Sequence, residues 1–148
     1  MQQTLILLKP DAVHRRLVGA ILQRFEAKGL RVAGMKMLQA DAALAKKHYA
    51  VHEGKPFYNS LIQFLTAGPT VAVCLEGREA VAVVRSMMGS TDGAKSAPGT
   101  IRGDFGISVQ NNLIHGSDSP ENARAEIELW FRPNELVAWN PVDGSWIG

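Results

Sequence analysis

Two short, uninterrupted apolar segments place the tightest limit on how this chain can fold. Residues 4–8 read Thr-Leu-Ile-Leu-Leu, and residues 71–75 read Val-Ala-Val-Cys-Leu. Successive side chains of a strand point to opposite faces, so a strand without polar positions has no face for water. Both segments are therefore predicted to be buried strands, the second over Thr70–Leu75 with Cys74 in the core. Pro10 ends the first, because proline cannot continue a central ladder.

Helical patterns alternate with these strands. Val18, Ile21, Leu22 and Phe25 recur at helical spacing, and Gly29 follows as a C-cap. Further helices are predicted over 42–49 after Asp41, from Pro56 to near Gly68, over 79–88, and from Pro120 to about Phe131 after Ser119 as N-cap. Two more strands are predicted near Leu30–Met37 and Leu113–His115, with a Gly-rich loop over 89–117 and an irregular tail over 133–148. This order predicts one α+β domain over residues 1–148, a four-stranded sheet with helices on one or both faces.

Composition excludes several classes of protein. With 148 residues, 46% hydrophobic and 20% charged, the chain is neither disordered nor fibrous. A single cysteine excludes an internal disulfide, and the N-terminus lacks the pattern of a signal peptide. The uncharged stretch 56–75 is interrupted by Asn59, Gln63 and Gly68-Pro69, which argues against a membrane span. We expect a soluble protein of the reducing cytoplasm.

Charge is unevenly distributed although the net charge is only +2. Residues 1–60 carry ten Lys and Arg against four Asp and Glu, whereas residues 104–148 carry two against seven. The two parts can attract one another, and the basic part can contribute to an anion site. Segregated solvated faces would give the same pattern.

The Gly-rich loop is a candidate phosphate site. It contains neither of the two common Gly-rich phosphate motifs, G-x-x-x-x-G-K-[ST] and G-x-G-x-x-G. Lys9, Arg85, Thr91 and Arg102 lie in or beside the segments that border it, and Arg and Lys are the side chains that bind phosphate oxygens. Turn formation alone would also explain the glycines.

One histidine stands apart from the other three. His115 ends a short apolar run, so its imidazole is expected where a strand meets a loop, within reach of Glu126 on the next helix. His48 and His52 have the spacing of a metal pair, but neighbouring lysines favour a solvated helix face. His14 is likewise expected at the surface. The spacing alone is also compatible with a purely structural role for His115.

Four segments resemble the nucleoside diphosphate kinase family. They are Lys9-Pro10-Asp11, Arg102-Gly103-Asp104-Phe105, the run from Asn112 to Asp118 that contains His-Gly-Ser-Asp, and Glu126 to Phe131. The similarity extends from Thr4 to about Val137. It implies a ferredoxin-like α/β sandwich with an antiparallel sheet. It also implies γ-phosphate transfer from a nucleoside triphosphate to a nucleoside diphosphate, ping-pong through a phosphohistidine, with Mg²⁺ carried on the nucleotide phosphates and not by protein side chains.

The resemblance implies a role for each matching residue. His115 would be the nucleophile, oriented by Glu126, which Ser117 supports. Phosphates and ribose would be held by Lys9, Tyr49, Arg85, Thr91, Arg102 and Asn112, with Tyr49 also counted among the catalytic residues. Phe57 would stack on the base and Val109 would contact its other side, so any base is expected to be accepted.

Two departures and two alternatives complete the prediction. Gly93 stands where the family commonly has proline, which affects loop rigidity and subunit contacts. The long tail with Trp139 and Trp146 favours a homohexamer, with a tetramer as the alternative.

A nucleic-acid-binding module would need basic and aromatic residues on its central strands, which the two apolar segments lack. A silent scaffold would most simply have lost His115 or Arg102.

Overall fold

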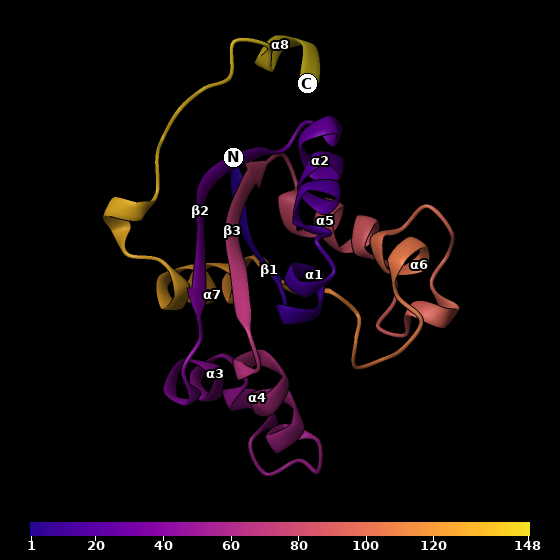
Figure 1. The fold of residues 1–148 in the computed structure, drawn as a ribbon. Helices are drawn as coiled ribbons and strands as arrows, with labels where there is room; N and C mark the ends of the chain where they lie inside the picture. Colours follow the sequence, from indigo (N-terminus) through magenta and orange to yellow (C-terminus); the bar gives the residue numbers. More distant parts are fainter.

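The computed structural model describes residues 1–148. Four strands form one antiparallel sheet in the order β2–β3–β1–β4 (Figure 1). They are β1 (Gln2–Leu8), β2 (Arg31–Gln39), β3 (Pro69–Gly77) and β4 (Ile114–Gly116). The predicted four-stranded antiparallel α+β fold is confirmed, and the two apolar segments are its central pair of strands.

The two central strands of the sheet, β1 and β3, are buried on both faces. Residues 4–8 of β1 are all fully buried, with Ile6 and Leu8 in one core and Leu5 and Leu7 in the other. This alternation explains why the segment has no polar face. Cys74 lies in the second core as expected, and burial raises the pKa of its thiol to about 12.

Helices form a layer on each side of the sheet. On the side of Ile6 lie α1 (Pro10–His14), α2 (Val18–Lys28), α5 (Ala80–Met88) and α6 (Ile101–Phe105). On the side of Leu5 lie α3 (Ala42–His48), α4 (Tyr58–Thr66) and α7 (Pro120–Trp130), and α8 (Gly144–Ile147) is a short turn near the C-terminus (Figure 1). None of these helices combines the length and the apolar character that a membrane-spanning helix requires.

The predicted helix ends have the expected chemistry. Gly29 closes α2 with φ +108°, a left-handed conformation that favours glycine. The Asp41 side chain accepts from the Leu44 N–H at 2.8 Å, and the Ser119 hydroxyl accepts from the Asn122 N–H at 3.1 Å. These caps satisfy backbone donors that the first helical turn leaves free.

The structure differs from the sequence prediction at three short helices, of which α8 lies in the tail predicted to be irregular. The five residues of α1 follow Lys9 directly, and the five residues of α6 lie inside the segment predicted as loop. Neither is long enough to show an apolar period. Thr100 nonetheless caps α6, its hydroxyl accepting from the Gly103 N–H at 3.0 Å.

The C-terminal tail runs along β2. The Val137 N–H donates to the Ala33 carbonyl at 2.8 Å, and the Trp139 indole N–H donates to the Val32 carbonyl at 2.9 Å. Lys36 pairs with Glu135 at 2.9 Å. The basic N-terminal part and the acidic C-terminal part thus meet directly, as their charges suggest.

Gly93 lies where two backbone segments touch. It is buried, and a Cβ placed on it would lie 2.5 Å from the Gly106 carbonyl carbon and 2.6 Å from its oxygen. No flexible side chain can give way there, because both partners are backbone. The glycine that departs from the family pattern is therefore required by close packing in this loop.

We expect Gly93→Ala to lower the free energy of unfolding by about 1–3 kcal/mol, the usual cost of overpacking. Chemical denaturation at fixed protein concentration measures the loss. Gly144→Ala is the matched control, because its added Cβ would approach no atom closer than 3.9 Å. Equal stability of the two variants would contradict the packing argument.

Candidate active site

His115 lies on β4, the edge strand beside β1. Its backbone is opposite Leu7, and directly opposed residues project to the same face of a sheet. Its imidazole is therefore on the side that α3 and α7 cover. The strand position sets the direction of the side chain.

A strained turn precedes this strand. Leu113 has φ +74°, and the Ile114 N–H donates to the Asn112 carbonyl at 2.8 Å, which makes a three-residue turn. A non-glycine residue in this region costs about 1–3 kcal/mol and persists only where its surroundings hold it. The Leu113 N–H donates to the Asp11 carboxylate at 3.1 Å, and the Leu113 carbonyl accepts from the Lys9 N–H at 2.9 Å.

Arg102 closes the turn from the other side. Its Nε donates to the Asn112 carbonyl at 3.2 Å, and its Nη2 donates to the Ile114 carbonyl at 2.6 Å. The residue is 7% exposed. Burial, with the charge of Arg85 adding to it, lowers the pKa of Arg102 to about 10, so the guanidinium remains charged at neutral pH. Arg102 is thus a structural cation as well as a candidate phosphate ligand.

Glu126, on α7, reaches back to His115 as predicted. His115 Nε2 and Glu126 Oε1 lie 2.9 Å apart, and the Ser117 hydroxyl donates to the same carboxylate oxygen at 2.6 Å. Ser117 is fully buried, and its oxygen accepts from the Leu5 N–H at 3.2 Å. The carboxylate is therefore tied through Ser117 to the central strand β1.

The ionisation of Glu126 is controlled by this network. Burial alone would raise its pKa, but the hydrogen bonds from His115 and Ser117 and the charge of His115 outweigh it and lower the pKa below the ordinary value. The carboxylate is thus ionised at neutral pH and can only accept hydrogen bonds.

A hollow of about 540 Å³ opens in front of His115. Most of the predicted nucleotide-binding residues line it, namely Lys9, Tyr49, Phe57, Thr91, Arg102, Val109 and Asn112. Phe57 and Val109 are exposed, 46% and 58%, whereas Lys9 and Arg102 are buried. An apolar rim and a cationic interior suit a ligand with an aromatic end and an anionic end.

Lys9 and Asn112 hold each other in place in this hollow. The Lys9 ammonium donates to the Asn112 side-chain oxygen, and the Asn112 amide donates to the Thr91 carbonyl at 3.1 Å. Burial lowers the pKa of Lys9 to about 8, although the charge of Asp11 opposes this shift. Lys9 is the first residue after β1, so the most buried strand directs it into the hollow.

Arg85 does not line this hollow. It borders a second space of about 320 Å³, together with His115, Glu126 and Tyr49, and it donates to the Gly116 carbonyl at 3.2 Å. His115 and Tyr49 line both spaces. Burial raises the pKa of Tyr49 to about 12, so its hydroxyl keeps its proton.

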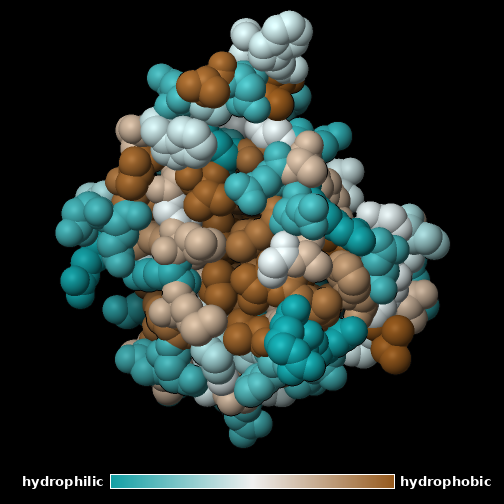
Figure 2. Space-filling model, turned by 45° about the horizontal axis from the view of Figure 1, so that its top comes forward, coloured by the Kyte–Doolittle hydropathy of each residue, from teal (hydrophilic) through white to brown (hydrophobic).

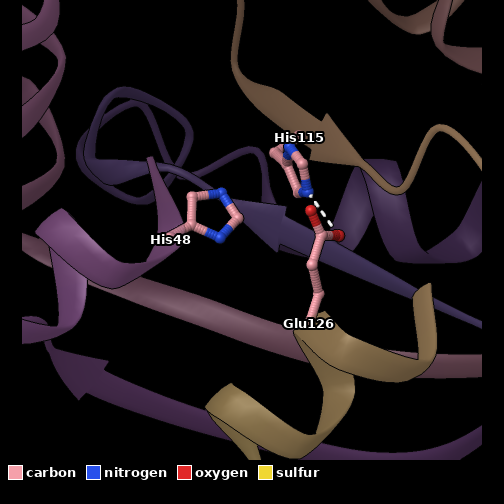
Figure 3. Close-up of side chains that lie close together, drawn as sticks. All are labelled: His48, His115 and Glu126. Carbon is pink, nitrogen blue, oxygen red and sulfur yellow. Dashed lines mark hydrogen bonds and ion pairs between the residues drawn. The ribbon is translucent and has the colours of Figure 1, made fainter. Parts of the chain in front are cut away.

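The prediction that His48 lies on a solvated helix face is wrong. Its ring lies edge-on to that of His115 (Figure 3), with the centroids 4.5 Å apart and an interplanar angle of 82°. Its Nδ1 accepts from the Trp130 indole N–H at 3.1 Å. His52, half-buried, lines the hollow and contacts the Phe57 ring edge-on at 5.3 Å. The predicted shared helix face is not formed, because α3 ends at His48 and His52 lies in a following 3-10 turn, but both histidines border the same space beside His115.

One group of three side chains has ligand atoms close enough for a metal ion. Atoms of His48, His115 and Glu126 lie within 4.8 Å of one another. These side chains already bond within the protein, His48 with Trp130 and His115 with Glu126. The geometry is that of a hydrogen-bonded cluster around His115.

Comparison with known proteins identifies the family of the chain. The family model described as nucleoside diphosphate kinase matches residues 2–136. The nucleoside diphosphate kinases of Roseiflexus sp. (strain RS-1) and Gloeobacter violaceus are each 53% identical over 147 residues, covering 99% of both chains. The structure of the Halobacterium salinarum enzyme in complex with CDP superposes with a TM-score of 0.97 at 45% identity, covering 99% of this chain and 98% of that chain.

The fold and the basic hollow beside a histidine define a nucleotide-binding phosphotransferase. The chain belongs to the nucleoside diphosphate kinase family, because the family model matches residues 2–136 and relatives share about half of the sequence over nearly its full length. It is an enzyme of that activity, as the sequence resemblance implied.

We expect Arg102→Lys to lower the free energy of unfolding by about 1–3 kcal/mol. A lysine ammonium lacks the planar fork with which Nε and Nη2 reach the Asn112 and Ile114 carbonyls, and a lost buried hydrogen bond to a charged group costs about 1.5–3 kcal/mol. Arg24→Lys is the control, because its pair with Asp104 is about a third exposed and contributes little. If Arg102→Lys unfolded at the same urea concentration as the native chain, the structural role of Arg102 would be refuted.

Proposed function

We propose that the enzyme carries the phosphoryl group on His115 between two half-reactions, from a nucleoside triphosphate to a nucleoside diphosphate. One observation supports this most directly. The ionised Glu126 carboxylate accepts from His115 Nε2, so a neutral imidazole keeps its proton on Nε2 and its lone pair on Nδ1. Nδ1 is therefore the nucleophilic atom in this proposal.

Each half-reaction balances on these atoms. The Nδ1 lone pair attacks the γ-phosphorus, and the bond from that phosphorus to the β-phosphate oxygen breaks, so the diphosphate leaves with its electron pair. The ring then carries positive charge, which the Glu126 carboxylate stabilises while Nε2 keeps its proton. In the second half-reaction a β-phosphate oxygen of the acceptor attacks the phosphorus, and the bonding pair returns to Nδ1.

Charge stabilisation is assigned to the cations around His115. The phosphoryl group spreads negative charge over its oxygens in flight, and Lys9, Arg85 and Arg102 supply fixed positive charge around the histidine. The hollow that contains Lys9 is lined by no carboxylate, so Mg²⁺ would be bound by the nucleotide phosphates. When bound to the nucleotide phosphates, Mg²⁺ neutralises part of their negative charge.

The nucleoside is assigned to the exposed rim. The base would lie between Phe57 and Val109, and Tyr49, Thr91 and Asn112 would contact the ribose and phosphates. A ring face reads no hydrogen-bonding edge, so all bases should be accepted. The relative from Halobacterium salinarum was solved with CDP, a diphosphate of the kind proposed here as acceptor.

We expect γ-labelled ATP to leave an acid-labile label on Nδ1 of His115. Unlabelled ADP, GDP, CDP and UDP should each remove it, with kcat/KM values within about two decades, each decade being ~1.4 kcal/mol. Peptide mapping and phosphorus NMR locate the label. His115→Ala should lose label and turnover but keep nucleotide affinity, because Lys9 and Arg102 remain.

His14→Ala is the control for this experiment, since His14 is exposed outside both hollows. It should label and turn over like the native enzyme. Label on another residue, or turnover by His115→Ala, would overturn the assignment. Label on Nε2 would overturn the role given to Glu126.

The assembly we propose is a homohexamer in the cytoplasm, the compartment consistent with a single, buried Cys74. Trp146 and Val142 of the tail are almost wholly exposed, and Met35 and Met37 of the edge strand β2 are 56% and 62% exposed. Figure 2 shows apolar side chains gathered on the face that β2 and β3 present. Apolar surface of this extent supports burial against further copies of the chain.

Light scattering should therefore give the mass of six chains. Deletion after Val137 should lower the mass or the melting temperature, because it removes both tail tryptophans. Substitution of Lys46, which is exposed on α3, by Ala should change neither quantity. A monomer or a tetramer of the full chain would contradict the hexamer.

A further inference from the structure

His48 occupies a position between α7 and the imidazole of His115. It is the last residue of α3, and its ring stands edge-on to His115, to Trp130 and to Tyr49, with centroids 4.5, 5.5 and 4.8 Å away. Figure 3 shows the three side chains His48, His115 and Glu126 converging from α3, β4 and α7. None of the functions described above uses His48.

Trp130 fixes the proton on His48. An indole N–H can only donate, so His48 Nδ1 must accept, and the proton of the neutral ring is on Nε2. Burial lowers the pKa of His48 to about 3, and the charges of His115 and Lys9 lower it further although Glu126 opposes them. The ring is thus held as one neutral tautomer.

His115 needs a second contact to have a defined direction. Its bond to Glu126 restrains Nε2, but one hydrogen bond leaves the ring free to turn about the line that joins the two atoms. The edge-on contact with His48, at an interplanar angle of 82°, comes from another element. Such T-shaped contacts have a preferred geometry and resist rotation of either ring.

We propose that His48 is a positioning residue that holds the plane of the His115 ring, so that Nδ1 faces the nucleotide hollow. The proposal rests on the function proposed above, in which His115 accepts the phosphoryl group. It adds Trp130 as the anchor of His48. His48 borders the smaller space beside His115 and Arg85, and it does not line the hollow that contains Lys9 and Arg102.

Two substitutions separate the ring from its hydrogen bond. His48→Asn places an oxygen near the position of Nδ1 and keeps an acceptor for Trp130, but it removes the ring that contacts His115. His48→Phe keeps the ring and leaves the Trp130 N–H without a partner. His14→Asn, the same change at an exposed histidine outside the site, is the matched control.

The experiment measures single-turnover phosphorylation of His115 by ATP, nucleotide affinity, steady-state kcat and KM, and Tm. We expect His48→Asn to phosphorylate about 10- to 100-fold more slowly, the scale of loss for a misaligned reacting group, with nucleotide affinity and Tm near native. His48→Phe should phosphorylate at nearly the native rate but melt several degrees lower, because a buried donor is unpaired.

These outcomes discriminate between positioning and simple support of the fold. A native phosphorylation rate in His48→Asn would overturn the proposal. So would equal slowing in His48→Phe, or a fall in nucleotide affinity matching the fall in rate. Label on His115 of the native enzyme is measured in the same series, so a failure of the underlying phosphohistidine is seen separately from a failure of the role of His48.

Discussion

The burial of β1 on both faces is the constraint on which the rest of the structure depends. Its residues 4–8 contribute to both cores, and its two edges pair with β3 and β4. A strand without access to water cannot change register without exposing apolar side chains. The residues attached to it therefore have defined positions, namely Lys9 at its end, His115 opposite Leu7, and Ser117 bonded to Leu5.

The active-site geometry is built outward from this strand by polar contacts. Ser117 links the backbone of Leu5 to Glu126, and Glu126 links to His115. On the other side, Arg102 and Asp11 hold the strained turn that aims β4. Glu126, Arg102 and Lys9 each have hydrogen-bond partners inside the protein, which explains why these charged groups are tolerated so close to the core.

Much of this arrangement could be predicted from local residues. Glycine and small polar caps at Gly29, Asp41 and Ser119 are local signals, and the structure confirms them. The pairing of His115 with Glu126 is predictable because a strand end and the following helix are close in the chain. The helices α1 and α6 are not predictable, because five residues are too few to express a helical period.

The sequence by itself determined the buried strands, the order of elements and the family, since periodicity, caps and motifs are properties of adjacent residues. Only the tertiary structure decided that His48 faces His115 and that Gly93 packs against the backbone of Gly106. It also decided that Arg102 donates to the carbonyls on either side of Leu113. Those contacts join residues of different elements. Whether a side chain such as His48 is solvated or buried depends on which face of its helix another element covers. A helix with lysines beside a histidine has the same local sequence pattern in both cases.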